Sequence, residues 1–419
     1  MSRSHPTLRT ETPIPEGFVV THSTTALLDL ARWRSWLMVL MMLAAALAAD
    51  RASADNAAPR KHVWAAPDSG SEGFEQLRAI AEALNKGPTP RVHLESSASH
   101  VGRARLLREG RAHYAATSVA GSVFAQEGLF AFASPDWGPQ PVRAVLMNPH
   151  GQLLGVVAAG DAGIDTVADL KGKRIARIKD APEVDQHLRA LLAHAGLGWK
   201  DVISVTTEGY AAAIKAVAAG RADAAFAASR TPDLQALAGS KRGLVWPLVP
   251  HADDAGWRQL RQWAPYMLPV DAVSGTGLSD KAPVESVSWP YPVLITLARR
   301  SSDEVFAMTA ELVKRHRDYR DTAPGNAGWE AKRQPLAWAI PWHDGAIRVF
   351  REQGLWRSEH QAHHDQLLER QRVLRQAWDA LQRAPSPDRD PVDEAAWLRA
   401  RADALRKAGL DVLWDASND

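Results

Sequence analysis

The sequence predicts an α/β fold in two lobes, followed by a helical appendage, and three observations support this prediction. Between Lys61 and about Gly354, short apolar runs alternate with segments of helical periodicity, as in a largely parallel sheet flanked by helices. The 365 residues that follow Ala54 exceed the roughly 250 to 300 at which a single hydrophobic core stops growing. After Gly354 the pattern becomes that of polar, amphipathic helices.

The strands are predicted from short apolar runs bounded by turn residues, and the helices from apolar residues three and four apart. The predicted strands are Val63–Ala66, Arg91–Glu95, His113–Thr117, Leu154–Ala158, Arg174–Ile178, Ala222–Ala227 and Val293–Leu297. One predicted buried helical face contains Phe74, Leu77, Ile80, Ala81 and Leu84, and another contains Val184, Leu188, Leu191 and Leu192. The alternation of helices and strands favours helices on both faces of the sheet.

The segments 107–115 and 217–225 resemble each other. Each consists of a helix end, a glycine and a strand start, with Gly110 and Gly220 at positions that suit the left-handed residue after a helix. Two similarly built lobes would produce such a match, although junctions of this kind are common in any α/β protein. We expect residues 61–150 and 270–355 to form one lobe and residues 151–265 the other.

Residues 356–419 are predicted to form a helical extension. Leu367, Leu374, Trp378 and Leu381 recur at heptad-like spacing, which indicates one long amphipathic helix. Pro385–Pro391 has the composition of a linker, and a last helix carries Trp397, Leu398 and Leu405. Both helices are expected to pack on the lobes.

Residues 1–54 have the layout of a secretory signal peptide. Trp36–Ala49 is an unbroken apolar run, with Arg32 and Arg34 before it and the small residues Ala52–Ala54 after it. The run is shorter than the roughly 20 residues of a membrane span. We therefore expect cleavage after Ala54 and a periplasmic mature protein. The polar stretch before Arg32 is long for a signal peptide, and an uncleaved membrane anchor is the alternative.

Composition excludes several classes of protein. The chain has no cysteine, which excludes disulfides, a thiol nucleophile, a thiolate metal site and a lipidated cysteine. The residues after Ala54 carry 45 basic and 44 acidic side chains, a balance that gives no reason to expect a nucleic-acid partner.

The common catalytic and cofactor motifs are absent. There is no G-x-S-x-G, H-E-x-x-H, Walker A or G-x-G-x-x-G segment, so we expect no enzyme activity and no cofactor. His360, His363 and His364 share one helical face, which could bind a metal, but we interpret them as a solvated face and expect no metal site. His343 and Asp344 are interpreted as a helix start rather than an acid/base pair.

Small hydroxyl residues gather at two predicted strand-to-helix turns. Asp68–Ser71 follows the first strand, and Ser96–Ser99 follows the second. Free backbone N–H groups at helix starts bind anions, and in open α/β sheets ligands bind beyond the carboxyl ends of the strands. We therefore predict ligand contacts from Ser69, Gly70, Ser71, Ser97 and Ser99. The alternative is that these residues only cap the helices.

Several segments, taken together, resemble a known family of transport receptors. Asp169–Arg174, Ala193–Leu197 and Gly220–Phe226 resemble the second lobe of periplasmic substrate-binding proteins, and the Gly325–Trp329 and Ile340–Glu352 segments look like the TAXI family of TRAP-transporter solute receptors. This resemblance covers about residues 61–380. It implies a two-lobed receptor that closes on a small organic acid or amino acid and delivers it to a TRAP membrane permease, which is driven by ion gradients.

The second lobe is expected to supply ligand contacts at equivalent strand ends. These are Lys179, Asp180, Ser229, Thr231 and Thr276. The chain departs from the family pattern in its first loop, where Glu72 adds a carboxylate. A sensor subunit of a membrane signalling protein, or less plausibly a periplasmic enzyme, are the alternative functions.

Overall fold

The computed structural model describes residues 61–87, 91–149, 152–383 and 394–414. The predicted signal segment, residues 1–54, and the predicted linker, Pro385–Pro391, lie outside these ranges. Within the described ranges, no helix is both long and apolar enough to cross a membrane.

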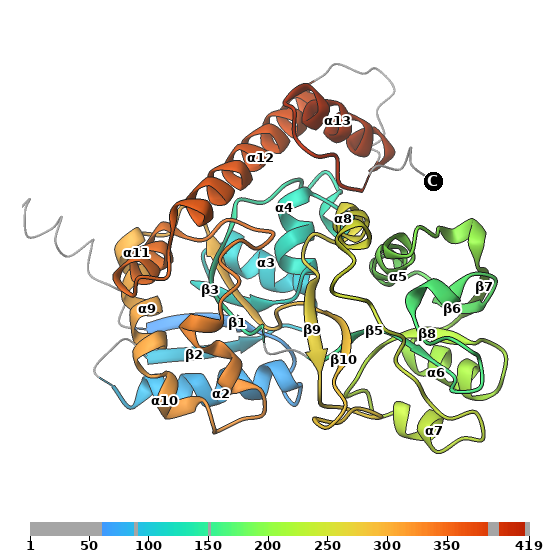
Figure 1. Cartoon of the computed structure of the whole chain (residues 1–419). Coiled ribbons are helices and arrows are strands. Elements are labelled where there is room, and N and C mark those ends of the chain that lie inside the picture. Colours follow the sequence, from blue (N-terminus) through green and yellow to red (C-terminus); the bar gives the residue numbers. More distant parts are fainter. Residues whose placement is uncertain (1–60, 88–90, 150–151, 384–393, 415–419) are drawn as a thin grey trace, which may run out of the picture. The chain divides into compact units, whose positions relative to one another are not determined.

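A five-stranded sheet is built from strands that are far apart in the sequence (Figure 1). In order across the sheet, its strands are β2 Arg91–Ser96, β1 Lys61–Ala66, β3 Tyr114–Thr117, β11 Val293–Leu297 and β4 Val142–Met147. β1 pairs in parallel with β2 and β3, whereas β11 is antiparallel to both β3 and β4. The carboxyl ends of β1 to β4 and the amino end of β11 therefore lie at one edge of this sheet.

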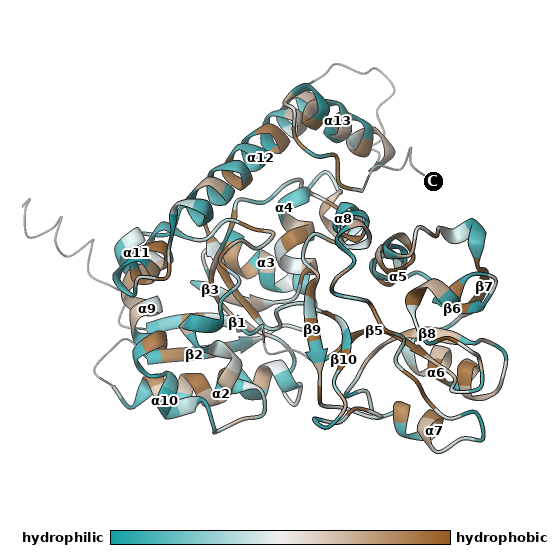
Figure 2. Cartoon of the chain, in the orientation of Figure 1, coloured by the Kyte–Doolittle hydropathy of each residue, from teal (hydrophilic) through white to brown (hydrophobic). Residues whose placement is uncertain are grey.

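A four-stranded sheet follows in the sequence. Its order is β5 Leu154–Ala158, β8 Ala224–Ala228, β6 Arg174–Ile178 and β7 Ile203–Thr207. β6 is parallel to β7 and β8, and β5 is antiparallel to β8. A separate antiparallel ribbon consists of β9 Leu268–Ala272 and β10 Val284–Ser288. In Figure 2, β5 and β8 carry apolar colours along their length, as expected for strands whose side chains are mostly buried.

Helices connect the strands of both sheets. Those that follow or pack on the five-stranded sheet are α2 Glu72–Asn85, α3 His100–Arg108, α4 Ala125–Glu127, α9 Ser302–Lys314, α10 His316–Tyr319 and α11 Asp344–Glu352, together with the π-helical turn η1 Ala120–Phe124. Those near the four-stranded sheet are α5 Pro182–His194, α6 Tyr210–Ala218, α7 Leu234–Ala238 and α8 Asp254–Trp263. The α/β class is thereby confirmed. Four of the five strands in the first sheet and three of the four in the second run in one direction, as expected for largely parallel sheets, and β11 and β5 run against their neighbours.

The two matching junctions have the same backbone geometry. Gly110 has φ 73° and Gly220 has φ 74°, both in the left-handed region that favours glycine. The amide of Ala112 donates to Leu106, and the amide of Ala222 donates to Ala216 in the equivalent way. Each junction turns a helix end directly into a strand, β3 in one sheet and β8 in the other.

The predicted C-terminal helices are present as α12 Ser358–Arg383 and α13 Glu394–Lys407. Trp378 and Trp397 pack edge to face, with ring centroids 5.0 Å apart. The indole of Trp397 also donates to the carbonyl of Gly128, 2.7 Å away, and so ties α13 to the turn after α4. Leu374 is buried with these tryptophans in a small core of its own.

Candidate functional site

The candidate site is the edge of the five-stranded sheet at which β1, β2 and β3 end. The register pairs Ala66 of β1 with Ser96 of β2, so the two serine-rich turns follow neighbouring strands at the same level. The amide of Ser97 donates to the carbonyl of Ala66, and the Ser96 hydroxyl donates to the carbonyl of Pro67. These bonds hold the turns beside each other.

Two of the predicted ligand-binding serines cap helices. The Ser71 hydroxyl accepts from the amide of Phe74 at 3.2 Å and donates to the carbonyl of Asp68 at 2.7 Å. The Ser99 hydroxyl accepts from the amide of Gly102 at 2.9 Å. The two bonds from the amides of Phe74 and Gly102 each satisfy one of the amides that a helix start leaves unpaired. Ser69 and Gly70 are exposed in the turn before α2, and Gly70 has φ 86°.

Arg103 is a buried charged group at this edge, and the sequence analysis did not select it. Its side chain is only 6% exposed, and its terminal nitrogen donates to the carbonyls of Ser97 and Ala98. Its Nε has no hydrogen-bond partner among the described residues. Burial lowers the pKa of the Arg103 guanidinium, while the nearby Tyr291 and Asp68 oppose that shift. A buried donor without a partner costs free energy unless a ligand or water completes it.

Three glycines let polar side chains approach the helix starts. A Cβ at Gly102 would overlap the Ser97 hydroxyl, and a Cβ at Gly121 would overlap the Thr117 hydroxyl. A Cβ at Gly73 would lie 2.7 Å from the Tyr291 phenol oxygen. The Thr117 hydroxyl is buried at the end of β3 and, like Arg103 Nε, lacks a partner among the described residues.

The residues predicted from the second lobe lie at strand ends of the four-stranded sheet or beside them. Lys179 and Asp180 are exposed directly after β6, and Asp180 has φ 55°, in the left-handed region. Ser229 is buried after β8; its hydroxyl donates to the carbonyl of Ser274 and its carbonyl accepts from the amide of Thr276. Thr231 follows in a turn, where its amide donates to Ala228. The two hydrogen bonds of Ser229 therefore join it to the segment that contains Ser274 and Thr276. Ligand contact by all ten predicted residues stays a prediction.

One ion pair joins the two neighbourhoods. Arg230, which follows Ser229, donates to the Glu72 carboxylate at the start of α2, with 2.8 Å between nitrogen and oxygen. Ser71 directly precedes Glu72, and Ser229 directly precedes Arg230. The ion pair therefore connects the two strand edges next to these two predicted residues. Burial raises the pKa of the Tyr291 phenol, an effect that Arg103 opposes and Glu72 reinforces.

An aromatic cluster around His187 contains residues from segments near both sheets. His187 of α5 packs against Trp289 with ring centroids 4.5 Å apart, against Phe226 at 5.2 Å and against Tyr266 at 5.7 Å. Tyr266 in turn contacts Phe124 of η1 at 5.7 Å. Neither ring nitrogen of His187 nor the Tyr266 hydroxyl has a partner among the described residues. Burial lowers the pKa of His187 to about 3, so its ring is neutral at physiological pH.

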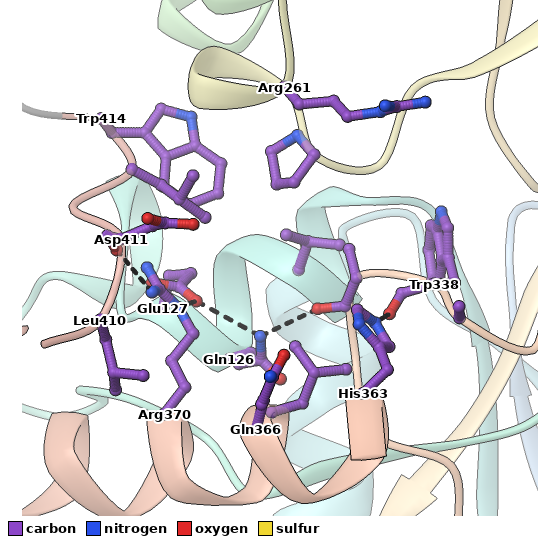
Figure 3. A pocket seen from close by; sticks show the side chains of 16 residues that line it. Gln126, Glu127, Arg261, Trp338, His363, Gln366, Arg370, Leu410, Asp411 and Trp414 are labelled. Atoms are coloured by element: carbon purple, nitrogen blue, oxygen red, sulfur yellow. Dashed lines mark hydrogen bonds and ion pairs between the residues drawn. The ribbon is translucent and has the colours of Figure 1, made fainter. Parts of the chain in front are cut away.

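A hollow of about 240 Å³ lies between the C-terminal extension and the segments around α4 and α8 (Figure 3). At its back, the buried carboxylate of Glu127 binds the guanidinium of Arg370 at 2.7 Å and that of Arg401 at 2.5 Å. Arg370 also donates to the carbonyl of Asp411. Burial raises the pKa of Glu127, but the two arginines outweigh it and lower the pKa to about 2. This network attaches the extension to η1 and α4.

The three histidines of α12 do not form the solvated face that the sequence suggested. His364 is 3% exposed and packs against Trp356, and His363 shares a hydrogen bond with the carbonyl of Trp338. His360 accepts from the amide of Arg357. Among the described residues, no group of three or more His, Asp or Glu side chains is placed to hold a metal ion. His343 caps α11 by accepting from the amide of Gly345, as predicted.

Searches against known proteins gave the following matches. The solved structures that resemble the chain include the periplasmic aliphatic sulphonate binding protein SsuA from Escherichia coli, at 15% identity and a TM-score of 0.39, over 86% of this chain and 91% of that one. They also include the L-cystine solute receptor of Neisseria gonorrhoeae, at 15% identity and a TM-score of 0.34, over 62% and 87% of the two chains. A search of curated proteins found no match.

A protein-family model gives the broadest assignment. The model of the NMT1-like family matches residues 69–354, which include every strand of the two sheets except β1 as well as the Glu72–Arg230 pair, and exclude the C-terminal helices. More than half of the sequence lies within this match. The chain belongs to the NMT1-like family.

Proposed function

We propose that this chain is an extracytoplasmic solute-binding receptor that captures a small organic acid or amino acid. In this proposal residues 61–150 and 270–355 form one lobe, residues 151–265 form the other, and the ligand binds between their strand ends. The receptor is periplasmic after export by its first 54 residues. It delivers the ligand to a membrane permease of the TRAP type, as the resemblance of the Ile340–Glu352 segment to TAXI receptors suggests.

The observation that carries the proposal is the buried guanidinium of Arg103. It lies where β1 and β2 end, two carbonyls fix one of its nitrogens, and its Nε–H has no partner among the described residues. A carboxylate or sulfonate would accept that hydrogen bond and neutralise the buried charge. The starts of α2 and α3 lie at the same edge, and their amide dipoles also favour an anion.

The proposed role is binding rather than catalysis. The hydroxyls of Ser71 and Ser99 cap helices, and neither is hydrogen-bonded to a histidine that could act as a base. A nucleophile needs such a base within hydrogen-bond reach. For the lobes to close on the ligand and to open for its release, the ligand needs only to make different contacts in the closed and the open state.

The first experiment identifies the ligand. Mass spectrometry of small molecules released by denaturing freshly purified protein should find an organic acid or amino acid. Calorimetric titration of that compound into Arg103→Gln should show affinity at least about tenfold weaker, because a hydrogen bond to a charged group contributes roughly 1.5 to 3 kcal/mol. Arg105→Gln, an exposed position on the same helix, should bind like the wild type.

Two results would contradict this proposal. The first is an Arg103→Gln variant that melts like the wild type and keeps full affinity. The second is the absence of any released acid together with no binding of glutamate, succinate or methanesulfonate. The TRAP partner is tested separately, because uptake of the ligand by host cells should stop when ion gradients collapse and continue when ATP alone is depleted.

A further inference from the structure

Arg230 is the cationic side chain that crosses from one strand edge to the other. It directly follows buried Ser229 at the end of β8, and its guanidinium reaches Glu72 in the first turn of α2, 158 positions away in the sequence. The backbone around it is fixed, because the Arg230 amide donates to the side chain of Gln152 at 3.3 Å. The guanidinium has two side-chain partners, the Glu72 carboxylate at 2.8 Å and the Ser274 hydroxyl at 3.5 Å.

Glu72 is held from its other side. The amide nitrogen of Gln76 lies 3.4 Å from the same carboxylate oxygen that binds Arg230, and Gln76 itself accepts from Asn148 and from the indole of Trp329. A network within one half of the molecule thus presents the Glu72 carboxylate to a guanidinium from the other half.

Both side chains of this pair keep access to solvent. The exposed fraction is 31% for Arg230 and 37% for Glu72. An ion pair with this exposure is weak and is screened by salt, so another anion that reaches the guanidinium can replace the carboxylate. The Tyr291 phenol oxygen lies against Gly73, the residue after Glu72, and Tyr291 interacts electrostatically with both Arg103 and Glu72.

We propose that Arg230 is a ligand-binding residue and that Glu72 occupies it in the unliganded receptor, where the pair holds the two halves together. This inference rests on the proposed function. The ligand anion exchanges places with Glu72 at the Arg230 guanidinium. Glu72 then competes with the ligand for Arg230, so an anion must bind the guanidinium more strongly than Glu72 does. A neutral solute cannot replace Glu72 there.

The first test needs no ligand. The chain has no cysteine, so Lys86→Cys and Lys215→Cys give unique sites for spin labels at exposed positions, one directly after α2 and one on α6. Distances between the labels are measured by double electron–electron resonance at low salt. Glu72→Gln should shift the ratio of short to long distances toward the long ones by up to about fivefold, the strength of an exposed pair. High salt should produce the same shift in the wild type.

Glu75→Gln is the matched control. Glu75 is also acidic, also lies in the first turn of α2, and pairs with Arg78 of the same helix rather than with the other half. Its replacement removes the same interaction with the helix dipole and should leave the distances unchanged. Equal distance distributions for the wild type and Glu72→Gln at low salt would overturn the proposal.

The second test uses defined anions. Glutamate, succinate and methanesulfonate, with acetamide as the neutral control, are titrated calorimetrically at constant ionic strength. An anion that binds the wild type should bind Glu72→Gln up to about fivefold more tightly and Arg230→Gln at least about tenfold more weakly. Wild-type affinity in Arg230→Gln would overturn the assignment of Arg230. If none of these anions binds the wild type, the anion receptor itself is contradicted, while the distance measurement still decides whether Glu72 holds Arg230.

Discussion

Ser71, Ser97 and Ser99 illustrate at the residue scale how one side chain type serves two purposes. Ser71 and Ser99 use their hydroxyls as helix caps. The Ser97 carbonyl holds Arg103, while its hydroxyl lies against Gly102 and caps no helix. Capping, one of the two interpretations that the sequence left open, therefore holds for Ser71 and Ser99. Ligand contact by any of the three serines stays a prediction.

Replacing these serines one at a time should separate the two roles. Ser71→Ala and Ser99→Ala should each lower the free energy of unfolding of the unliganded protein by about 1 kcal/mol, the usual cost of a lost cap. Ser97→Ala should change it by less than about 0.5 kcal/mol and should weaken ligand binding instead. Urea unfolding and calorimetric titration measure the two effects. Equal losses of stability in all three variants would mean that Ser97 is structural as well.

The sequence could predict the serines but not Arg103. Ser and Asp after an apolar run indicate a helix start, which is a local pattern. The burial of an arginine depends instead on segments that are distant in the sequence, here Tyr291, which lies almost 190 positions after Arg103. Apart from its spacing to the turn Ser96–Ser99, nothing near Arg103 in the sequence distinguishes it from Arg105, which is exposed.

At the scale of elements, the strands that the sequence missed have recognisable reasons. β7 is an edge strand with two exposed residues at its start and polar serine and threonine within it. β9 contains Pro269, which cannot donate to a neighbouring strand and is typical of exposed strands. The predicted strands with continuous apolar runs, such as Leu154–Ala158 and Val293–Leu297, have the predicted bounds. Burial alone does not make a strand predictable, because β4 is buried along almost its whole length and is not among the predicted strands.

The attachment of α13 depends on a charge that is buried and fully paired. Arg401→Leu should reduce the free energy of unfolding at pH 7 by about 3 to 5 kcal/mol, because it leaves the buried Glu127 carboxylate with one guanidinium instead of two. Arg399→Leu, at an exposed position of the same helix, should have little effect. Urea unfolding followed by circular dichroism measures both. A small loss in Arg401→Leu would show that the tryptophan contacts alone hold the helix.

The same network predicts how acid affects the extension. The pKa of Glu127 is lowered to about 2, so its pairing stabilises the folded state above the ordinary glutamate pKa and is lost as the pH falls through that range toward 2. The difference in stability between the wild type and Arg401→Leu should therefore shrink as the pH falls from 5 to 3. A difference that is independent of pH would contradict the assigned charge of Glu127.

At the scale of the whole molecule, the aromatic cluster around His187 joins parts of both sheets. Phe124 comes from the turn after β3 of the five-stranded sheet, and Phe226 is part of β8 of the four-stranded sheet. His187 contacts Tyr266 and Trp289. Both of these residues lie in the part of the chain that leads from the four-stranded sheet back to β11 of the five-stranded sheet. Loss of this cluster should weaken the contact between the two sheets more than it affects either sheet.

His187 makes this cluster sensitive to pH. Its pKa is lowered to about 3 in the folded protein, against an ordinary value of 6.5, so its contribution to stability is complete above 6.5 and falls as the pH decreases toward 3. Between pH 7 and pH 5 this histidine should cost about 2 kcal/mol of unfolding free energy. His187→Leu should lose that much less over the same interval, as measured by urea unfolding. His93→Gln, at an exposed position of β2, should behave like the wild type.

The Glu127 network also has a consequence for the order in which the chain acquires its core. Glu127 is synthesised 243 residues before Arg370 and 274 residues before Arg401. For most of elongation the carboxylate therefore exists without either guanidinium, and burying an unpaired carboxylate is very costly. We therefore expect the segment around α4 to become fully buried only when α12 and α13 pack against it. The C-terminal helices would then complete the fold last, wherever the chain folds.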